Sequence, residues 1–315
     1  MTTPIRNRIF LVCLSAALFG AAAASAGNVS VTTGGEKEIE DCRQLRIHFD
    51  WRHAERAEET FTVARSTAPL EVHLPAHSGI QVTGWDRDEF SVTACKAAAE
   101  RDSLDRIFVT PERDRLAVRG PEGDDWMVYL ILRAPRAAAL DLEARHGPIG
   151  LRGVSGKLRA RNTNGPISFR DSSGEIEART ENGPISLKDC SGEVRAEAVN
   201  GPIHVSGKEG NFRVNTQNGP ISVALEGERW ERGALEARAV NGPLSLTLPE
   251  NYRSGVRVEM RGNSPVSCQA PACKGARKTW DEGERRIEFG DSEPVVRMST
   301  VNGPVTIKAR DKARD

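Results

Sequence analysis

The sequence predicts an all-β protein, a parallel β-solenoid with coils of about 18 residues that follows a more irregular β-rich N-terminal portion. Two observations predict this fold. The tripeptide Asn-Gly-Pro occurs six times, and its first four copies are spaced by 18 residues. Between these copies apolar and polar residues alternate with a period of two, which is typical of strands that bury one face. Aromatic residues make up only 5% of the 315-residue chain, which suits a narrow coil.

The tripeptides are expected to form the corners of the coil, flattened or triangular in section. A His-Gly-Pro copy at His146 extends the period backward, and an Asn-Ser-Pro copy at Asn263 is degenerate. The 39 residues from Asn263 to Asn302 are long enough for one further coil without a marker. The corner residues are Asn164, Gly165, Pro166, Asn182, Gly183, Pro184, Asn200, Gly201, Pro202, Asn218, Gly219, Pro220, Asn241, Gly242, Pro243, Asn302, Gly303 and Pro304.

Each residue of the tripeptide suits a corner. Glycine accepts the dihedral angles of a sharp bend, and proline fixes its own φ and begins a strand at a position that needs no N–H. Asparagine amides at equal positions of successive coils can bond to one another, as they do in cross-β stacks. We therefore expect Asn164, Asn182, Asn200 and Asn218 to stack in one column, the alternative being that they are plain turn residues.

Composition divides the chain into four segments. They are a signal peptide (1–26), an irregular β region of opening coils or a sandwich-like cap (27–140), a regular solenoid (141–307) and a charged, disordered tail (308–315). The signal peptide is indicated by Arg6 and Arg8, a short apolar stretch and an A-x-A cleavage site that ends at Ala26. Without this leader the chain has slightly more acidic than basic residues. It therefore lacks the positive charge that a nucleic-acid-binding protein would need.

The irregular region contains short alternating runs separated by turns with Pro, Gly and Asp. The strands expected there are 60–63, 70–74, 79–83, 90–93, 107–110, 115–119 and 127–132. A short helix is expected within 95–104.

Five cysteines follow the signal peptide, so at least one thiol is free. Cys268 and Cys273 are five residues apart and fit a small disulfide-closed loop. Cys42 with Cys95 is one option for a second bridge, and the pairing of Cys42, Cys95 and Cys190 stays open. Because Cys190 fills a turn position of the repeat, we interpret it as a small turn residue. Structural use is favoured over redox or zinc chemistry, since no pair has the CxxC spacing.

Three features resemble the bacterial putative adhesin family of exported β-solenoid proteins. They are the segment GIQVTGWDRD at 79–88, the segment ILRAP at 131–135 and the serial NGPIS units. The resemblance covers roughly residues 60 to 310. It implies the solenoid fold and offers no catalytic residues to carry over.

Few side chains suggest chemistry. His73 and His77 have the i, i+4 spacing of a metal pair, but an intervening proline argues against the helix that would align them. Asp86, Asp88 and Glu89 form an acidic turn that we expect to be solvated, rather than to act as an acid–base pair or to bind a cation.

Other candidates lie in and between the coils. His146 and His204 are expected at ordinary surface positions. Trp230 and Trp280 lie in segments that break the period, and we expect them to cover a coil edge, the alternative being contact with a partner.

The sequence thus predicts a non-enzymatic, exported protein of the periplasm or cell envelope, or a secreted one, with no cofactor and no metal. It would present an extended surface for adhesion or for binding a protein or another envelope component. It has no expected nucleic-acid partner and no membrane span after cleavage of the leader. One alternative is a self-assembling envelope scaffold. A less favoured one is a polysaccharide-active enzyme, which would need paired carboxylates and aromatic platforms.

Overall fold

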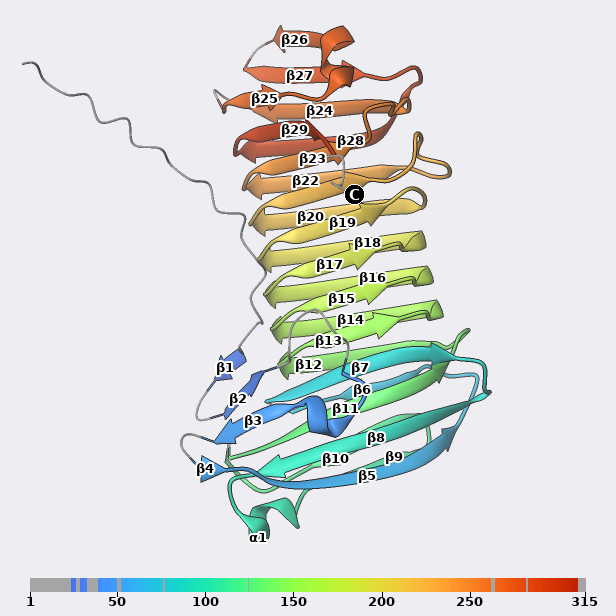
Figure 1. Ribbon diagram of the computed structural model, residues 1–315, viewed down its shortest axis with the longest axis vertical. Coiled ribbons are helices and arrows are strands. Elements are labelled where there is room, and N and C mark those ends of the chain that lie inside the picture. The colour runs from blue at the N-terminus through green and yellow to red at the C-terminus, as the bar shows by residue number, and fades with distance from the viewer. Residues whose placement is uncertain are drawn as a thin grey trace, which may run out of the picture.

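The computed structural model describes residues 24–26, 29–32, 39–49, 52–75, 77–123, 125–261, 264–281 and 283–310 (Figure 1). The described chain is nearly all β, as predicted. It has two large, mostly parallel sheets, one of 13 strands (sheet 1) and one of 12 (sheet 2), and a four-stranded antiparallel sheet. The helical segments are α1 (Arg101–Leu104) and the 3-10 turns η1 (Cys42–Gln44) and η2 (Pro271–Gly275). The expected signal peptide lies outside the described residues except for 24–26.

Sheet 1 contains the longer strands of the repeats. In spatial order its strands are β26 (Arg277–Asp281), β27 (Glu284–Phe289), β24 (Gly255–Arg261), β28 (Pro294–Asn302), β22 (Leu235–Asn241), β20 (Asn211–Asn218), β18 (Ser191–Asn200), β16 (Ser173–Asn182), β14 (Ser155–Asn164), β12 (Leu140–His146), β6 (Leu70–His73), β10 (Arg115–Arg119) and β9 (Phe108–Glu112).

Sheet 2 contains the shorter strands that follow the corners. In spatial order they are β25 (Val266–Cys268), β29 (Val305–Ala309), β23 (Leu244–Leu248), β21 (Ile221–Leu225), β19 (Ile203–Gly207), β17 (Ile185–Lys188), β15 (Ile167–Arg170), β13 (Ile149–Arg152), β7 (Ser78–Trp85), β11 (Trp126–Pro135), β8 (Glu89–Ala98) and β5 (Glu55–Ala64). The small sheet consists of β1 (Ala24–Ala26), β2 (Val29–Thr32), β3 (Arg46–Phe49) and β4 (Arg52–His53).

Through the repeats the chain gives one strand to each large sheet in turn. Leu158 of β14 pairs with Ile176 of β16, and Ile167 of β15 pairs with Ile185 of β17. Both partners lie one 18-residue repeat further along the chain. Figure 1 shows the resulting strands stacked above one another along the long axis of the molecule. The 18-residue period of the sequence therefore determines which residues pair between neighbouring strands in both sheets.

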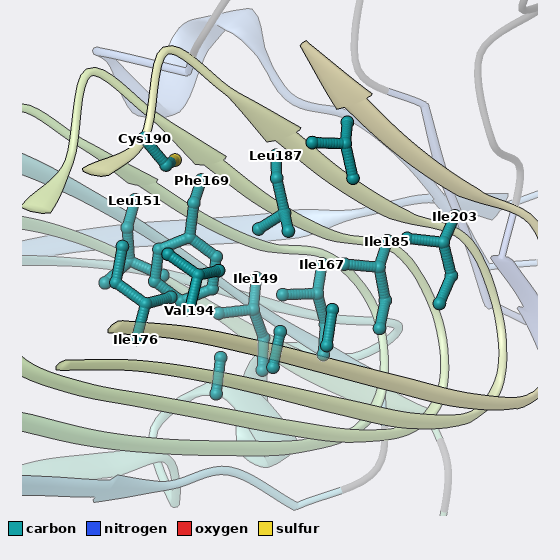
Figure 2. Packing of buried hydrophobic residues seen from close by; sticks show 14 of the residues in the cluster. Ile149, Leu151, Ile167, Phe169, Ile176, Ile185, Leu187, Cys190, Val194 and Ile203 are labelled. Atoms are coloured by element: carbon teal, nitrogen blue, oxygen red, sulfur yellow. The ribbon is translucent and has the colours of Figure 1, made fainter. Parts of the chain in front are cut away.

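The core lies between the two sheets and consists of the apolar side chains of the alternating pattern. Ile149, Ile167, Ile185 and Ile203 occupy one position in successive repeats and are at most 1% exposed. Figure 2 shows these side chains in a row, with the apolar side chains of sheet 1 packed against that part of the core. Because equal positions stack, each apolar column is buried as a continuous strip.

The corner glycines are required by the closeness of successive repeats. A Cβ atom placed on Gly201 would lie 2.0 Å from the carbonyl oxygen of Gly183. The N–H of Gly201 donates in the other direction, to the carbonyl oxygen of Asn218 at 3.0 Å. The glycines of the six Asn-Gly-Pro corners have no positive φ, although Gly147 of the His-Gly-Pro copy has a φ of 134°. At the opposite turn, Gly174 and Gly192 have φ of 104° and 93°. The corner position therefore excludes a side chain mainly because of the backbone of the neighbouring repeat.

The N-terminal portion extends both sheets less regularly. Strand β6 pairs in parallel with β12, and β7 pairs in parallel with β13, so these two strands add one opening layer. Strand β11 pairs in parallel with β7, and β8 and β5 then continue sheet 2 with antiparallel pairs. All seven strands expected in this portion are present. Strands β5, β7, β8 and β11 are longer than expected, whereas β6, β9 and β10 agree with the expected bounds to within two residues. Helix α1 lies inside the stretch where a helix was expected.

The C-terminal repeats depart from chain order. Strand β28 lies between β22 and β24, and β29 lies between β23 and β25, so the last repeat is inserted beneath the one before it. The expectation of a further coil after Asn263 is wrong. The segment instead forms η2 and the antiparallel hairpin β26–β27, which covers the exposed edge of β24. Asn263 itself lies outside the described residues.

The expected tail begins later than its composition indicated. Lys308 and Ala309 belong to β29, and the N–H of Arg310 donates to the carbonyl oxygen of Leu248 at 2.8 Å. The expectation of a disordered tail from residue 308 is therefore wrong for these three residues, because sheet 2 continues through them. Residues 311–315 lie outside the described chain.

The corner geometry makes Gly201→Ala a sensitive test. We expect the added methyl group to push neighbouring corners apart and to lower the free energy of unfolding by about 2–3 kcal/mol. Gly207→Ala is the matched control, since its Cβ would meet nothing closer than 4.0 Å. It should cost less than about 1 kcal/mol. Urea denaturation measures both, and equal losses would contradict the close-approach explanation.

Candidate functional site

The asparagine corners form one continuous hydrogen-bonded column. The amide nitrogen of Asn182 donates to the side-chain oxygen of Asn164 at 2.9 Å, and Asn200 donates to Asn182 at the same distance. The column continues upward through Asn218, Asn241 and Asn302, with distances of 2.9, 3.0 and 2.9 Å. The inserted last repeat thus keeps its place in the column although 61 residues separate Asn302 from Asn241.

The lower end of this column is formed by histidine. His146 Nδ1 lies 3.2 Å from the amide nitrogen of Asn164. The ring of His146 is half-buried and stacks on His77, with ring centroids 5.8 Å apart. His77 therefore contacts His146 rather than forming an i, i+4 pair with His73, which ends strand β6. Within the described ranges, no cluster of three or more histidine, cysteine or carboxylate side chains could hold a metal ion.

The outer face of sheet 1 carries columns of charged side chains that run along the stack. Opposite charges often meet on neighbouring strands, as in Arg159–Glu177 at 3.3 Å. Arg161 similarly binds Asp141 at 2.9 Å. Such cross-strand pairs support a sheet when opposite charges face each other. This face is therefore long, polar and largely fixed by its own ion pairs.

The outer face of sheet 2 is different, because small hydroxyl residues occupy its central column. Ser168, Ser186, His204 and Ser222 follow one another in register. His204 was expected at an ordinary surface position, but it is only partly exposed, and the loss of solvent around its ring lowers its pKa. This column thus consists of serine side chains interrupted by one histidine, His204.

The acidic turn is held by arginines, two from other segments and one from the turn itself. Each of its three carboxylates binds a guanidinium group: the pairs are Asp86–Arg136 at 2.7 Å, Asp88–Arg65 at 2.8 Å and Glu89–Arg87 at 3.7 Å. All three carboxylate side chains are at least 40% exposed. A solvated, ion-paired turn can fix the connection between β7 and β8, but it offers no pair of carboxylates aimed at a common substrate.

Two disulfides link four of the five cysteines of the described residues. Cys268 and Cys273 bridge the end of β25 to η2, and Cys42 bridges η1 to Cys95 in β8. Cys190 is free and 2% exposed, with its sulfur 3.5 Å from the carbonyl oxygen of Lys188. Burial raises the pKa of the Cys190 thiol to about 12, so this group is a packed core side chain rather than a nucleophile.

The two tryptophans in segments that break the period have opposite surroundings. Trp230 is only 6% exposed, packs edge-on against Phe212 and donates its indole N–H to the carbonyl oxygen of Gly210 at 3.1 Å. Trp280 in β26 is 64% exposed. Trp230 is therefore a buried side chain packed against the core, whereas Trp280 is open to solvent.

No described helix is both long and apolar enough to cross a membrane.

No family model matches the chain, and no curated protein is similar to it. Several solved structures resemble it in outline. A putative adhesin from Bacteroides fragilis shares 12% identity, with 81% of this chain and 97% of that chain covered and a TM-score of 0.37. A putative lipid binding protein from Parabacteroides distasonis shares 10% identity over 81% and 97%, with a TM-score of 0.43. A putative cell adhesion protein from Clostridium sporogenes shares 11% identity over 81% and 100%, with a TM-score of 0.24.

The asparagine column predicts that Asn200→Ala removes two side-chain hydrogen bonds at once, those with Asn182 and Asn218. We expect the free energy of unfolding to fall by about 1–2 kcal/mol. Gln217→Ala is the control, because this exposed side chain lies next to the column and outside it; its cost should stay within about 0.5 kcal/mol. Equal melting temperatures for the two variants would show that the column adds no stability.

The raised pKa of Cys190 predicts a pH dependence. The unfolded thiol ionises at its ordinary pKa, while the folded thiol keeps its proton until about pH 12. Between the two pKa values the folded state therefore binds more protons than the unfolded state. The contribution of Cys190 to the free energy of unfolding falls as the pH rises through this range. Cys190→Ala should flatten the decline measured by urea denaturation above pH 9. An unchanged slope in the variant would assign the decline to other groups.

Proposed function

We propose that this chain is a non-enzymatic, exported β-solenoid of the cell envelope that presents an extended surface for adhesion or for binding a protein partner. Its two large sheets would be the two walls of coils of about 18 residues, with residues 27–140 as the opening cap and 141–307 as the regular part. The observation that supports this proposal best is the length of the outer faces. Thirteen strands at about 4.8 Å each give a face on the order of 60 Å long.

Export is supported by the cysteines and by the leader sequence. Disulfides persist in oxidising compartments, and the Cys42–Cys95 bridge ties η1 to β8 across 53 residues. The positively charged start, the apolar stretch and the A-x-A site that ends at Ala26 fit a cleaved signal peptide. We therefore propose the periplasm or the envelope, or secretion, as the location of the mature chain.

Self-assembly is the second candidate, and the exposed edge of β26 favours it. All five residues of β26 are exposed, including Trp280, and its outer backbone edge has no partner strand in the described chain. An open edge of this kind can pair with another chain. At the opposite end of the molecule, β5 carries Glu55, Glu58 and Glu59 on exposed positions, and charges on an edge strand oppose such pairing.

Glycan cleavage is the least favoured alternative. A glycosidase needs two carboxylates on either side of the scissile bond. The acidic turn does not supply them, because each of its carboxylates is bound by an arginine. The exposed Trp280 lies on a different strand, at the far end of the stack.

The proposal predicts that the full chain, produced with its leader in a bacterial host, is processed and recovered from periplasmic or envelope fractions. The processed protein should then bind isolated envelopes in a saturable manner that unlabelled protein competes away. The same protein after reduction and unfolding is the control, since it has the same composition without the two ordered faces.

Three outcomes would overturn the proposal. They are recovery of the unprocessed chain in the cytoplasm, envelope binding that does not saturate or equals that of the unfolded control, and release of sugars from a panel of envelope glycans. Filaments that lengthen with protein concentration in electron micrographs would favour the self-assembling scaffold instead.

A further inference from the structure

A hollow of about 680 Å³ lies on the outer face of sheet 1, across β16, β18, β20, β22 and β28. It forms where the position occupied by Glu175 and Glu193 in the lower repeats is taken by the smaller Asn211 and Ala234. The hollow is open along the stack rather than enclosed. A ligand lying here would cross several strands.

The carboxylates of the hollow already have partners. Each of the four binds a side chain of its own: the pairs are Glu175 with Lys157 at 3.1 Å, Glu177 with Arg159 at 3.3 Å, Glu193 with Asn211 at 2.6 Å and Glu236 with Arg238 at 3.3 Å. Three of these carboxylates are therefore balanced by a cation, whereas Glu193 is bound by the neutral amide of Asn211.

The arginines of the hollow have no such partners. Arg195, Arg213 and Arg297 line it, and all three are exposed. Arg195 and Arg213 are register neighbours, and Arg297 follows two strands later in the same column. Within the part of the chain that the structure describes, none of the three guanidinium groups has a hydrogen bond or an ion pair. Three guanidinium groups of one column, with Glu236 between Arg213 and Arg297, are thus left without an ion pair of their own.

We infer that this hollow binds an anionic polysaccharide, with its carboxylate or sulfate groups on Arg195, Arg213 and Arg297. Guanidinium groups bind such oxyanions with two parallel hydrogen bonds. From β18 to β28 the column rises three strand spacings, about 14 Å, which suits charges repeated along a chain rather than a single small anion. The inference deepens the proposed function and rests on it, because it names the partner that the adhesive face would hold.

Two other extended anions fit the hollow less well. Single-stranded nucleic acid needs aromatic surfaces on which its bases stack, and the aromatic residue of the hollow, Phe212, is buried in the core. An acidic peptide would gain most from backbone pairing at a strand edge, whereas all five strands of the hollow lie inside sheet 1. A sugar chain needs neither exposed aromatic side chains nor a free strand edge.

The test is titration of the full processed chain with polygalacturonate, by calorimetry at low salt. Dextran sulfate is the second anionic probe, and dextran of similar length is the neutral one. The variant combines Arg195→Gln, Arg213→Gln and Arg297→Gln. Its matched control combines Arg133→Gln, Arg145→Gln and Arg277→Gln, which removes the same charge from exposed arginines outside the hollow.

We expect binding of at least one anionic polymer, none of dextran, and a loss of ten-fold or more in affinity in the hollow variant but not in its control. Preference for one polymer would identify the bound group as carboxylate or sulfate. Equal losses in both variants, equal binding of dextran, or tighter binding of single-stranded DNA than of either polymer would overturn the inference. Saturable envelope binding that the hollow variant retains would overturn the inference alone and leave the adhesive role standing.

Discussion

The structure depends on how closely successive corners approach one another. At Gly201 the neighbouring backbone lies where a Cβ atom would be, and the asparagine beside it exchanges hydrogen bonds with the asparagines above and below. A slip by one residue would place a side chain in that contact and would turn every apolar residue outward. The corner therefore fixes the register, and the register fixes both the apolar core and the polar outer faces.

A fixed register also decides which charges meet. Because equal positions of all repeats form one column, a charge repeated without change would face its own copies. The chain avoids this on much of sheet 1 by alternating sign, as between Arg159 and Glu177. Where it does not, as at Arg195 and Arg213, like charges lie on adjacent strands. Such positions are the places where the charge pattern of the outer face departs from the regular pairing of opposite signs.

Much of this architecture could be predicted from the sequence, because the corner motif and the period-two alternation act locally and repeat. The strands of the irregular portion were also predictable, since each is bounded by turn residues. The insertion of β28 beneath β24 was not, because strand order at an edge depends on which pairing buries more surface rather than on spacing. Nor could the burial of Trp230 be foreseen: its indole reaches Gly210, 20 residues earlier, only once the stack exists. The unpartnered arginines needed the same three-dimensional knowledge, since the repeats that contain them carry both signs of charge.

The inserted last repeat has a consequence for how the molecule is made. Strand β24 leaves the growing chain about 40 residues before β28, yet β28 must occupy the place next to β22. During synthesis, β22 therefore offers a free edge that β24 could occupy first, in the wrong place. Contacts between segments far apart in sequence form slowly. Final assembly of this end must wait for the last strand to arrive, so the lower repeats can order as they emerge while the upper end matures only after residue 309 is available.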